Sequence, residues 1–204
     1  MSAFTCYFDA SGTQHDQLAL AVAGFLSTAD CWLEFEREWK KRLQKSGLKY
    51  FHRKEIGNKH PGLVADLASI IRDHAQRKFG MVVRVKAMHD LVSEIDIANW
   101  SLDAYSYAGR ACAAYVRMWA DKHHLRNLPE MVFASGDKGR DQLEHRLKKD
   151  GFEAVFRAAI EQVDRKTGRV LSAAAPLQAA DLFAYELFAP TRKKERLSTG
   201  IRKT

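Results

Sequence analysis

The chain has 204 residues, of which 46% are hydrophobic and 28% are charged. These values suit one globular domain with a substantial core, since chains of this length bury about 70% of their unfolded surface. No apolar stretch approaches the roughly 18 residues of a membrane span. The start, MSAFTCYFD, has no basic residues followed by a long apolar core, so we expect no membrane partner and a cytoplasmic location.

The charge balance is basic, with 33 Lys and Arg against 25 Asp and Glu and a formal net charge of +8. A basic surface favours a polyanion such as DNA or RNA, because binding releases counterions from the phosphates. A merely soluble basic protein has the same composition. Six of the basic residues lie in TRKKERLSTGIRKT, which predicts a basic tail at 191–204 after a domain at 1–190.

The three cysteines form no CxxC pair and are odd in number. This pattern predicts buried thiols in a reducing compartment and argues against a zinc site built on cysteine.

The first elements are a strand pair and a helix. Two apolar runs, 4–8 and 18–26, joined by SGTQHDQ, predict a β-hairpin. After them, Trp32, Phe35, Trp39 and Leu43 recur at steps of 3, 4 and 4, which places them on one face of a helix. Thr28 or Asp30 is the expected start of this helix, and Ser46-Gly47 its end.

The rest of the chain alternates between helices and strands. We expect helices at about 63–78, 101–125, 140–149 and 176–189, strands at 80–88 and 131–133, and a short extended piece at 168–176. The segment 152–162 has no clear period. With no repeat or interdomain linker, this order predicts a single α/β layer domain.

Three carboxylates lie where apolar sequence usually avoids charge. Asp9 ends the first strand, Asp137 follows the strand MVF inside SGDKG, and Asp181 lies within the almost wholly apolar final helix. An ionised carboxylate in such surroundings loses hydration at a high cost, unless a cation neutralises it or its pKa rises. Carboxylates suit Mg²⁺ or Mn²⁺, and a two-metal site requires several acids from separate elements. The three aspartates are therefore the candidate metal ligands.

Each acid also has an ordinary interpretation. Asp9 and Asp137 precede glycine-containing turns, where aspartate is common, and Asp181 could pair with an arginine in the core. The joint occurrence of all three favours the metal site over three separate coincidences.

Two further polar groups join the candidate site. Glu55 follows His52 by three residues in FHRKEI, which places both on one face of a helical turn, although an exposed acid among basic neighbours has the same pattern. Gln178 precedes Asp181 by three residues and could orient that carboxylate or contact a phosphate.

The sequence resembles the bacterial DUF3800 family nearly end to end. The resemblance rests on YFDASG, FHRKEI, VFASGDKG and, most specifically, PLQAADLFAYE. It implies a ribonuclease H-like α/β fold, with a single mixed sheet flanked by helices. Carried over by position, Asp9, Asp137 and Asp181 match the family's proposed metal-binding acids. Gln178 matches the glutamine of the last motif, and Glu55 with His52 is a looser match.

Two positions depart from the family pattern. Members commonly have Asp-Glu-Ser-Gly at the first motif and Phe-Glu-x-Gly-Asp at the third, whereas this chain has Ala10 and Ala134 in place of the two glutamates. Natural divergence and deliberate replacement both explain such alanines. Either way, less negative charge is available to hold two cations.

Two functional hypotheses follow. The first is a metal-dependent nuclease-like phosphodiester hydrolase, using Mg²⁺ or Mn²⁺ and weakened or inactivated by the two alanines. The residues expected to contact nucleic acid are Lys138, Arg140, Gln178, His52 and Arg53. The alternative is a non-catalytic module on the same fold that binds nucleic acid or protein, with an oligomer also allowed. A hydrolase of small phosphorylated molecules is compatible with the same acids, and DNA is not distinguished from RNA.

Overall fold

The computed structural model describes residues 3–14, 17–94, 103–163, 170–171 and 173–198. Its centre is a five-stranded sheet in the order β3-β2-β1-β4-β5. The strands are β1 (Phe4–Ser11), β2 (Ala19–Thr28), β3 (Arg77–Arg84), β4 (Glu130–Ala134) and β5 (Ala154–Arg157). A separate antiparallel pair consists of β6 (Gln162–Val163) and β7 (Val170–Leu171). Because β1 pairs antiparallel with β2 and parallel with β4, the sheet is mixed, as predicted.

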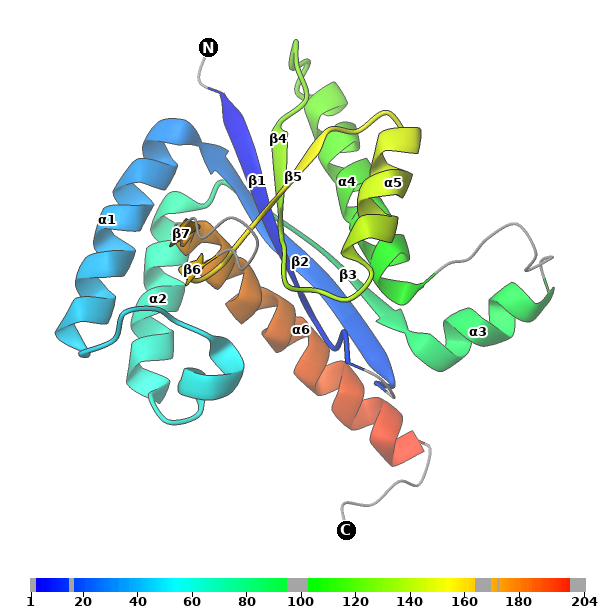
Figure 1. The fold of residues 1–204 in the computed structure, drawn as a ribbon, viewed down its shortest axis with the longest axis horizontal. Coiled ribbons are helices and arrows are strands. Elements are labelled where there is room, and N and C mark those ends of the chain that lie inside the picture. The colour runs from blue at the N-terminus through cyan, green and yellow to red at the C-terminus, as the bar shows by residue number, and fades with distance from the viewer. Residues whose placement is uncertain (1–2, 15–16, 95–102, 164–169, 172, 199–204) are drawn as a thin grey trace.

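Helices cover both faces of this sheet (Figure 1). One layer contains α1 (Ala29–Lys45), α2 (Pro61–His74) and α6 (Ala175–Ser198), and the other contains α4 (Ala104–Lys122) and α5 (Arg140–Lys149). A short π-helical turn, η1 (Arg53–Gly57), precedes α2, and α3 (Val85–Glu94) projects beyond the edge strand β3. The described structure is thus an α/β sandwich of helix, sheet and helix.

Strand β1 contributes side chains to the hydrophobic cores on both faces of the sheet, because successive side chains of a strand point to opposite faces. Cys6 and Phe8 are fully buried against α4 and α5, whereas Tyr7 packs toward the layer of α1 and α6. By the same alternation, Asp9 lies on the α6 face and Ala10 lies on the α4 face. The strand therefore delivers a carboxylate to the side of the sheet that α6 covers.

The predicted hairpin and first helix are confirmed. β1 and β2 pair from Phe4 with Thr28 to Ser11 with Ala21, and the four apolar residues of the helical stripe are all buried. Thr28, one of the two expected caps, accepts a hydrogen bond at Oγ1 from the backbone N–H of Cys31. Of the three cysteines, Cys6 and Cys112 are buried.

The boundary between α2 and β3 differs from the prediction. The helix expected at 63–78 ends at His74, and the strand expected at 80–88 begins at Arg77 and ends at Arg84. Arg77 and Lys78 look helical in sequence because they are charged. In the structure they are exposed on an edge strand, where charged side chains prevent further pairing. Helix α3, which begins at Val85, was not predicted.

The C-terminal part also extends beyond the prediction. The ambiguous segment forms β5 and β6, and the extended piece contributes β7. Helix α6 continues through Pro190 to Ser198, so the residues expected to begin a tail at 191 are helical up to 198. Proline removes one backbone donor, and the Thr191 hydroxyl donates to the carbonyl of Leu187 in the same turn. The expected helix start at 101–102 and the rest of the tail, 199–204, lie outside the described residues.

Candidate active site

A cavity of about 430 Å³ opens beside the end of β1, where residues from β1, β4 and α6 meet. Parallel strands bring their carboxyl ends to the same edge of a sheet, and β1 and β4 are parallel. The predicted site residues that line the cavity are Asp9, Ala10, His52, Glu55, Ala134, Asp137 and Asp181. The fold therefore gathers all the proposed acids from four separate segments into one depression.

The negative charges of both other aspartates act on Asp9. Its Oδ1 accepts a 2.7 Å hydrogen bond from the backbone N–H of Ala10. Burial raises the pKa of this carboxyl well above its usual range, and the negative charges of Asp137 and Asp181 raise it further. The single backbone donor opposes this rise without cancelling it.

Asp137 lies three residues beyond β4. The hydroxyl of Thr13, in the turn after β1, donates to its Oδ1 at 3.1 Å. Its Oδ2 is buried and has no hydrogen-bond partner among the residues that the structure describes. Burial raises the pKa of Asp137 to about 6, the Thr13 hydrogen bond lowers it in part, and the charge of Asp181 raises it. A buried acceptor without a donor is costly, so this oxygen is suited to a cation.

Asp181 is held from the η1 side. The backbone N–H of Arg53 donates to its Oδ2 at 2.6 Å, and its Oδ1 lies 3.9 Å from Nε2 of His52. The pKa of Asp181 is raised by burial, while the Arg53 amide and the nearby His52 charge lower it. The ordinary interpretation, an arginine ion pair in the core, is wrong, because the Arg53 guanidinium pairs with Glu186 instead.

His52 connects two of the acids. Its Nδ1 lies 3.4 Å from Oε1 of Glu55, and its Nε2 faces Asp181. Glu55 has a 58% exposed side chain and accepts a 3.3 Å hydrogen bond from the hydroxyl of Tyr50. The expectation that His52 and Glu55 lie on one face of a helical turn is confirmed by this contact, and Glu55 is more exposed than the three aspartates.

The types of donor atom in the cavity suit a divalent cation, but the spacing of those atoms does not. Burial raises the pKa of all three carboxyl groups, and the charge of Asp181 raises the pKa of Asp9 and of Asp137 further. One oxygen of Asp137 has no hydrogen-bond partner among the described residues. Within the part of the chain that the structure describes, however, no three His, Cys, Asp or Glu side chains form a group that could hold a metal ion. Asp9, Asp137 and Asp181 would have to move closer together to share one ion.

Ala10 and Ala134 both line the cavity. Ala134 is buried with Val132 and Leu177 under α6, on the face that carries Asp9. Ala10 packs on the α4 side. A carboxylate at either position would therefore add negative charge to the cavity wall.

The predicted nucleic-acid contacts are only partly supported. Gln178 is buried, and both polar atoms of its amide are hydrogen-bonded away from the site: Oε1 accepts from Nε1 of Trp39 and from the N–H of Phe51, and Nε2 donates to the carbonyl of Ala159. The interpretation of Gln178 as a contact to phosphate or an orienting group for Asp181 is wrong for this reason.

Of the four other predicted contacts, His52 lines the cavity and the remaining three, Arg53, Arg140 and Lys138, lie outside its lining. The Arg53 side chain is occupied by Glu186 and Asn58. The Arg140 guanidinium lies over the ring of Phe156 at 5.2 Å. Lys138 is exposed beside Asp137, so its contact with nucleic acid stays a prediction.

The lining residues that were not predicted from the sequence include Thr13, Tyr50, Lys54, Tyr185 and Arg192. Thr13 donates a hydrogen bond to Asp137, which is distant in sequence, and Tyr50 donates one to Glu55 in η1. Neither contact can be predicted from a local sequence pattern. Tyr185 and Arg192 had a usable signal, because they follow Asp181 by 4 and 11 residues on the same helix, spacings that return to one helical face.

None of the helices among the described residues is both long and apolar enough to cross a lipid bilayer.

Comparison with known proteins identifies the fold. No protein-family model and no curated protein matches the chain. Ribonuclease HII from the PCNA:RNase HII complex of Archaeoglobus fulgidus matches with a TM-score of 0.52 and 16% identity, over 100% of this chain and 81% of that one. Ribonuclease H2 of Pyrococcus horikoshii OT3 matches with a TM-score of 0.52 and 12% identity, over 97% and 78% of the two chains.

A third solved structure, Bst-RNase HIII in complex with Mn²⁺, gives a TM-score of 0.54 at 12% identity. The match covers 98% of this chain and 56% of that one, so this chain spans little more than half of that protein. Identities this low establish the fold and not the activity. The chain has a ribonuclease H-like α/β fold, as the sequence predicted.

Proposed function

We propose that this chain is a metal-dependent, nuclease-like phosphodiester hydrolase of the DUF3800 type, with an acidic site depleted by two alanines. The observation that carries the proposal is the convergence of Asp9, Asp137 and Asp181 in one cavity, although they come from β1, the loop after β4 and α6. Three carboxylates are rarely gathered in one partly buried cavity of a site without a function, because desolvation and mutual repulsion both disfavour their charged forms.

In this proposal the three aspartates hold Mg²⁺ or Mn²⁺. When bound, the metal would supply Lewis acidity toward a phosphate oxygen and activate a water molecule. Thr13 and the Arg53 backbone amide hold Asp137 and Asp181 in place through hydrogen bonds. His52, between Asp181 and Glu55, presents an N–H donor to either carboxylate.

Phosphate binding is assigned to cations on the cavity wall. Lys54 and Arg192 both line the cavity, and neither has a carboxylate within ion-pair distance among the described residues. Cations on the wall of a cavity that also holds several acids suit a phosphodiester, which needs positive charge for its oxygens and acids for the metal.

The two alanines set the expected level of activity. Loss of both glutamates removes two potential oxygen ligands, so we expect weak metal binding and slow or absent cleavage in the chain as it stands. The test is a paired cleavage assay with Mg²⁺ and Mn²⁺ on labelled DNA and RNA, comparing this chain with Ala10→Glu/Ala134→Glu. The double variant carrying Asp181→Asn as well serves as the matched negative control.

Each outcome has a defined meaning. Cleavage by the double variant that is lost on adding Asp181→Asn would support the proposal. Cleavage that persists without Asp181 would contradict the assignment of that acid. If neither protein cleaves and calorimetry detects no Mg²⁺ or Mn²⁺ binding, the proposal is refuted.

The alternative is a non-catalytic nucleic-acid-binding module on the same fold. It is favoured by the absence of a ready-made group of metal ligands among the described residues. Such a module would bind nucleic acid with a steep salt dependence and without any metal requirement.

A further inference from the structure

One face of α6 lines the cavity along much of its length. Asp181, Tyr185, Phe188 and Arg192 all contribute to the cavity wall, and they follow one another at steps of 4, 3 and 4, the spacing of a single helical face. Eleven residues at 1.5 Å each make this row about 16 Å long. We call these four residues the α6 track. It leads from the buried acids, past two aromatic rings, to a cation.

Tyr185 is fixed before any ligand arrives. The Arg53 guanidinium lies over its ring, 4.8 Å from the centroid, in a cation–π contact. Arg53 is itself held by Glu186 at 2.7 Å and by Asn58 at 3.1 Å. The ring is half-buried, with one face supported by protein. A rigid aromatic surface loses little conformational entropy on binding.

Phe188 and Arg192 continue the same arrangement. Phe188 is buried at 4% exposure and packs against the turn after β1, where Gly12 has no Cβ and a φ of +87°. The Arg192 guanidinium lies 5.2 Å from the Phe188 ring centroid. No carboxylate of the described residues forms an ion pair with Arg192, so its donors are available to a phosphate.

We propose that the α6 track binds a single-stranded segment of nucleic acid, with a base or sugar stacked on Tyr185 and a phosphate bound by Arg192. This inference rests on the proposed function, because the strand would enter the same cavity as the acids.

The single-stranded form follows from the chemistry of the track. In a duplex each base face is covered by its neighbours, so an aromatic side chain can stack only on an unstacked base. Base stacking on aromatic rings combined with contacts from cations is the usual mode of binding single strands. The track supplies both groups on one helical face, with the cation one helical turn beyond the second ring.

The test measures binding in EDTA, by fluorescence anisotropy, of labelled oligo(dT), oligo(U) and a blunt duplex of mixed sequence. We expect Tyr185→Ala and Arg192→Gln each to weaken binding of the single strands about 10-fold. Arg192→Gln should also reduce the salt dependence by about 0.7 in the slope of log K against log salt. Tyr185→Phe keeps the ring and should bind like the native chain.

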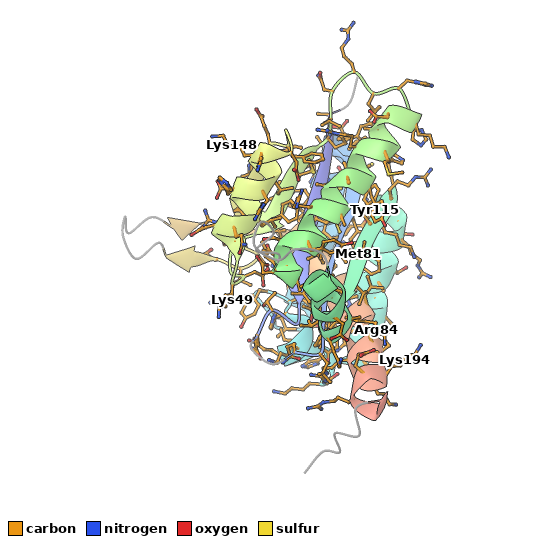
Figure 2. The ribbon with its side chains drawn as sticks, turned by 90° about the vertical axis from the view of Figure 1, so that its right-hand side faces the viewer. Lys49, Met81, Arg84, Tyr115, Lys148 and Lys194 are labelled. Atoms are coloured by element: carbon orange, nitrogen blue, oxygen red, sulfur yellow. The ribbon has the colours of Figure 1, made fainter. Side chains whose placement is uncertain are left out.

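Lys194→Gln is the matched control. It removes the same charge from the same part of α6 (Figure 2), but Lys194 is exposed and does not line the cavity. We expect less than about a twofold effect on binding. Circular dichroism of every variant checks folding, and Arg192→Gln, a surface change, carries the test if Tyr185→Ala does not fold.

Several results would overturn the inference. Equal losses for Arg192→Gln and Lys194→Gln would indicate only general charge attraction. Tighter binding of the duplex than of either single strand would remove the argument from stacking. Binding that is unaffected by either track variant, while Ala10→Glu/Ala134→Glu still cleaves, would refute the track alone. Binding that depends on the track, without cleavage by the double variant, would refute the proposed catalysis alone.

Discussion

Replacing Asp137 with asparagine tests whether the negative charge of this side chain destabilises the folded protein. Burial and the charge of Asp181 raise the pKa of Asp137 from 3.8 to about 6. Each pKa unit corresponds to about 1.4 kcal/mol, so ionised Asp137 destabilises the native state by roughly 2 to 3 kcal/mol at neutral pH. Asparagine carries no charge, and its Oδ1 can still accept the hydrogen bond from Thr13. We therefore expect Asp137→Asn to be more stable than the native chain at neutral pH.

The pH dependence gives the sign of the effect. Below pH 3.8 the carboxyl is protonated in both the folded and the unfolded chain, and the charge costs nothing. Between 3.8 and about 6 the unfolded chain releases its proton while the folded chain retains it, so native stability falls as the pH rises. The gain from Asp137→Asn should thus be near zero around pH 4 and complete near pH 7.

Thermal unfolding followed by circular dichroism in EDTA, at several pH values, measures this gain. For a chain of this length we expect a rise in Tm of roughly 5 to 10 °C at neutral pH. Asp141→Asn is the matched control, since its side chain is 97% exposed in the first turn of α5. That variant should lose a few tenths of a kcal/mol, because a carboxylate stabilises a helix start. A less stable Asp137→Asn protein at pH 7, or a gain independent of pH, would refute the reasoning.

Three further changes test the scaffold around the site. Gln178→Leu leaves two donors and one acceptor without partners, so urea unfolding should show a loss of about 2 to 5 kcal/mol; the same change at exposed Gln44 should cost under about 0.5 kcal/mol. Gly12→Ala places a Cβ 2.5 Å from a backbone oxygen at φ +87° and should lower the free energy of unfolding by more than about 2 kcal/mol. Its control, Gly47→Ala, has φ +69° and open space around the new Cβ, so it should cost about 1 kcal/mol. Equal losses for the two variants would contradict the steric argument. Asp103→Ala removes the cap that accepts from the Ser106 N–H at 2.8 Å and should lower the free energy of unfolding by about 1 kcal/mol.

Sequence patterns correctly predicted those elements and candidate acids that depend mainly on residues close to one another in the sequence. The helical stripe of α1 was readable because four aromatic or aliphatic residues repeat at helical spacing, and all four are buried. Asp181 stood out because a charge within an apolar helix needs a special environment. The structure provides that environment through a backbone donor, the N–H of Arg53, which a sequence pattern does not contain.

The errors came from interactions between distant segments. Gln178 was interpreted as a site residue because it lies one turn from Asp181. Its partners are Trp39 and Phe51, which are 139 and 127 residues away. The start of β3 was misplaced because Arg77 pairs with Leu26 across the sheet, and this pairing outweighs the helical appearance of charged residues.

The position of α6 in the chain has a consequence for how the protein is made. This helix packs on β1 and β2, although about 150 residues of chain separate it from them. During synthesis the strands leave the ribosome long before the helix that covers them, and contacts between such distant segments form slowly. An apolar face of the sheet is exposed during that interval. Asp181 lies on α6 and joins the other acids only when that helix packs on the sheet, so the cavity acquires its complete set of acids at the same step that covers this face of the sheet.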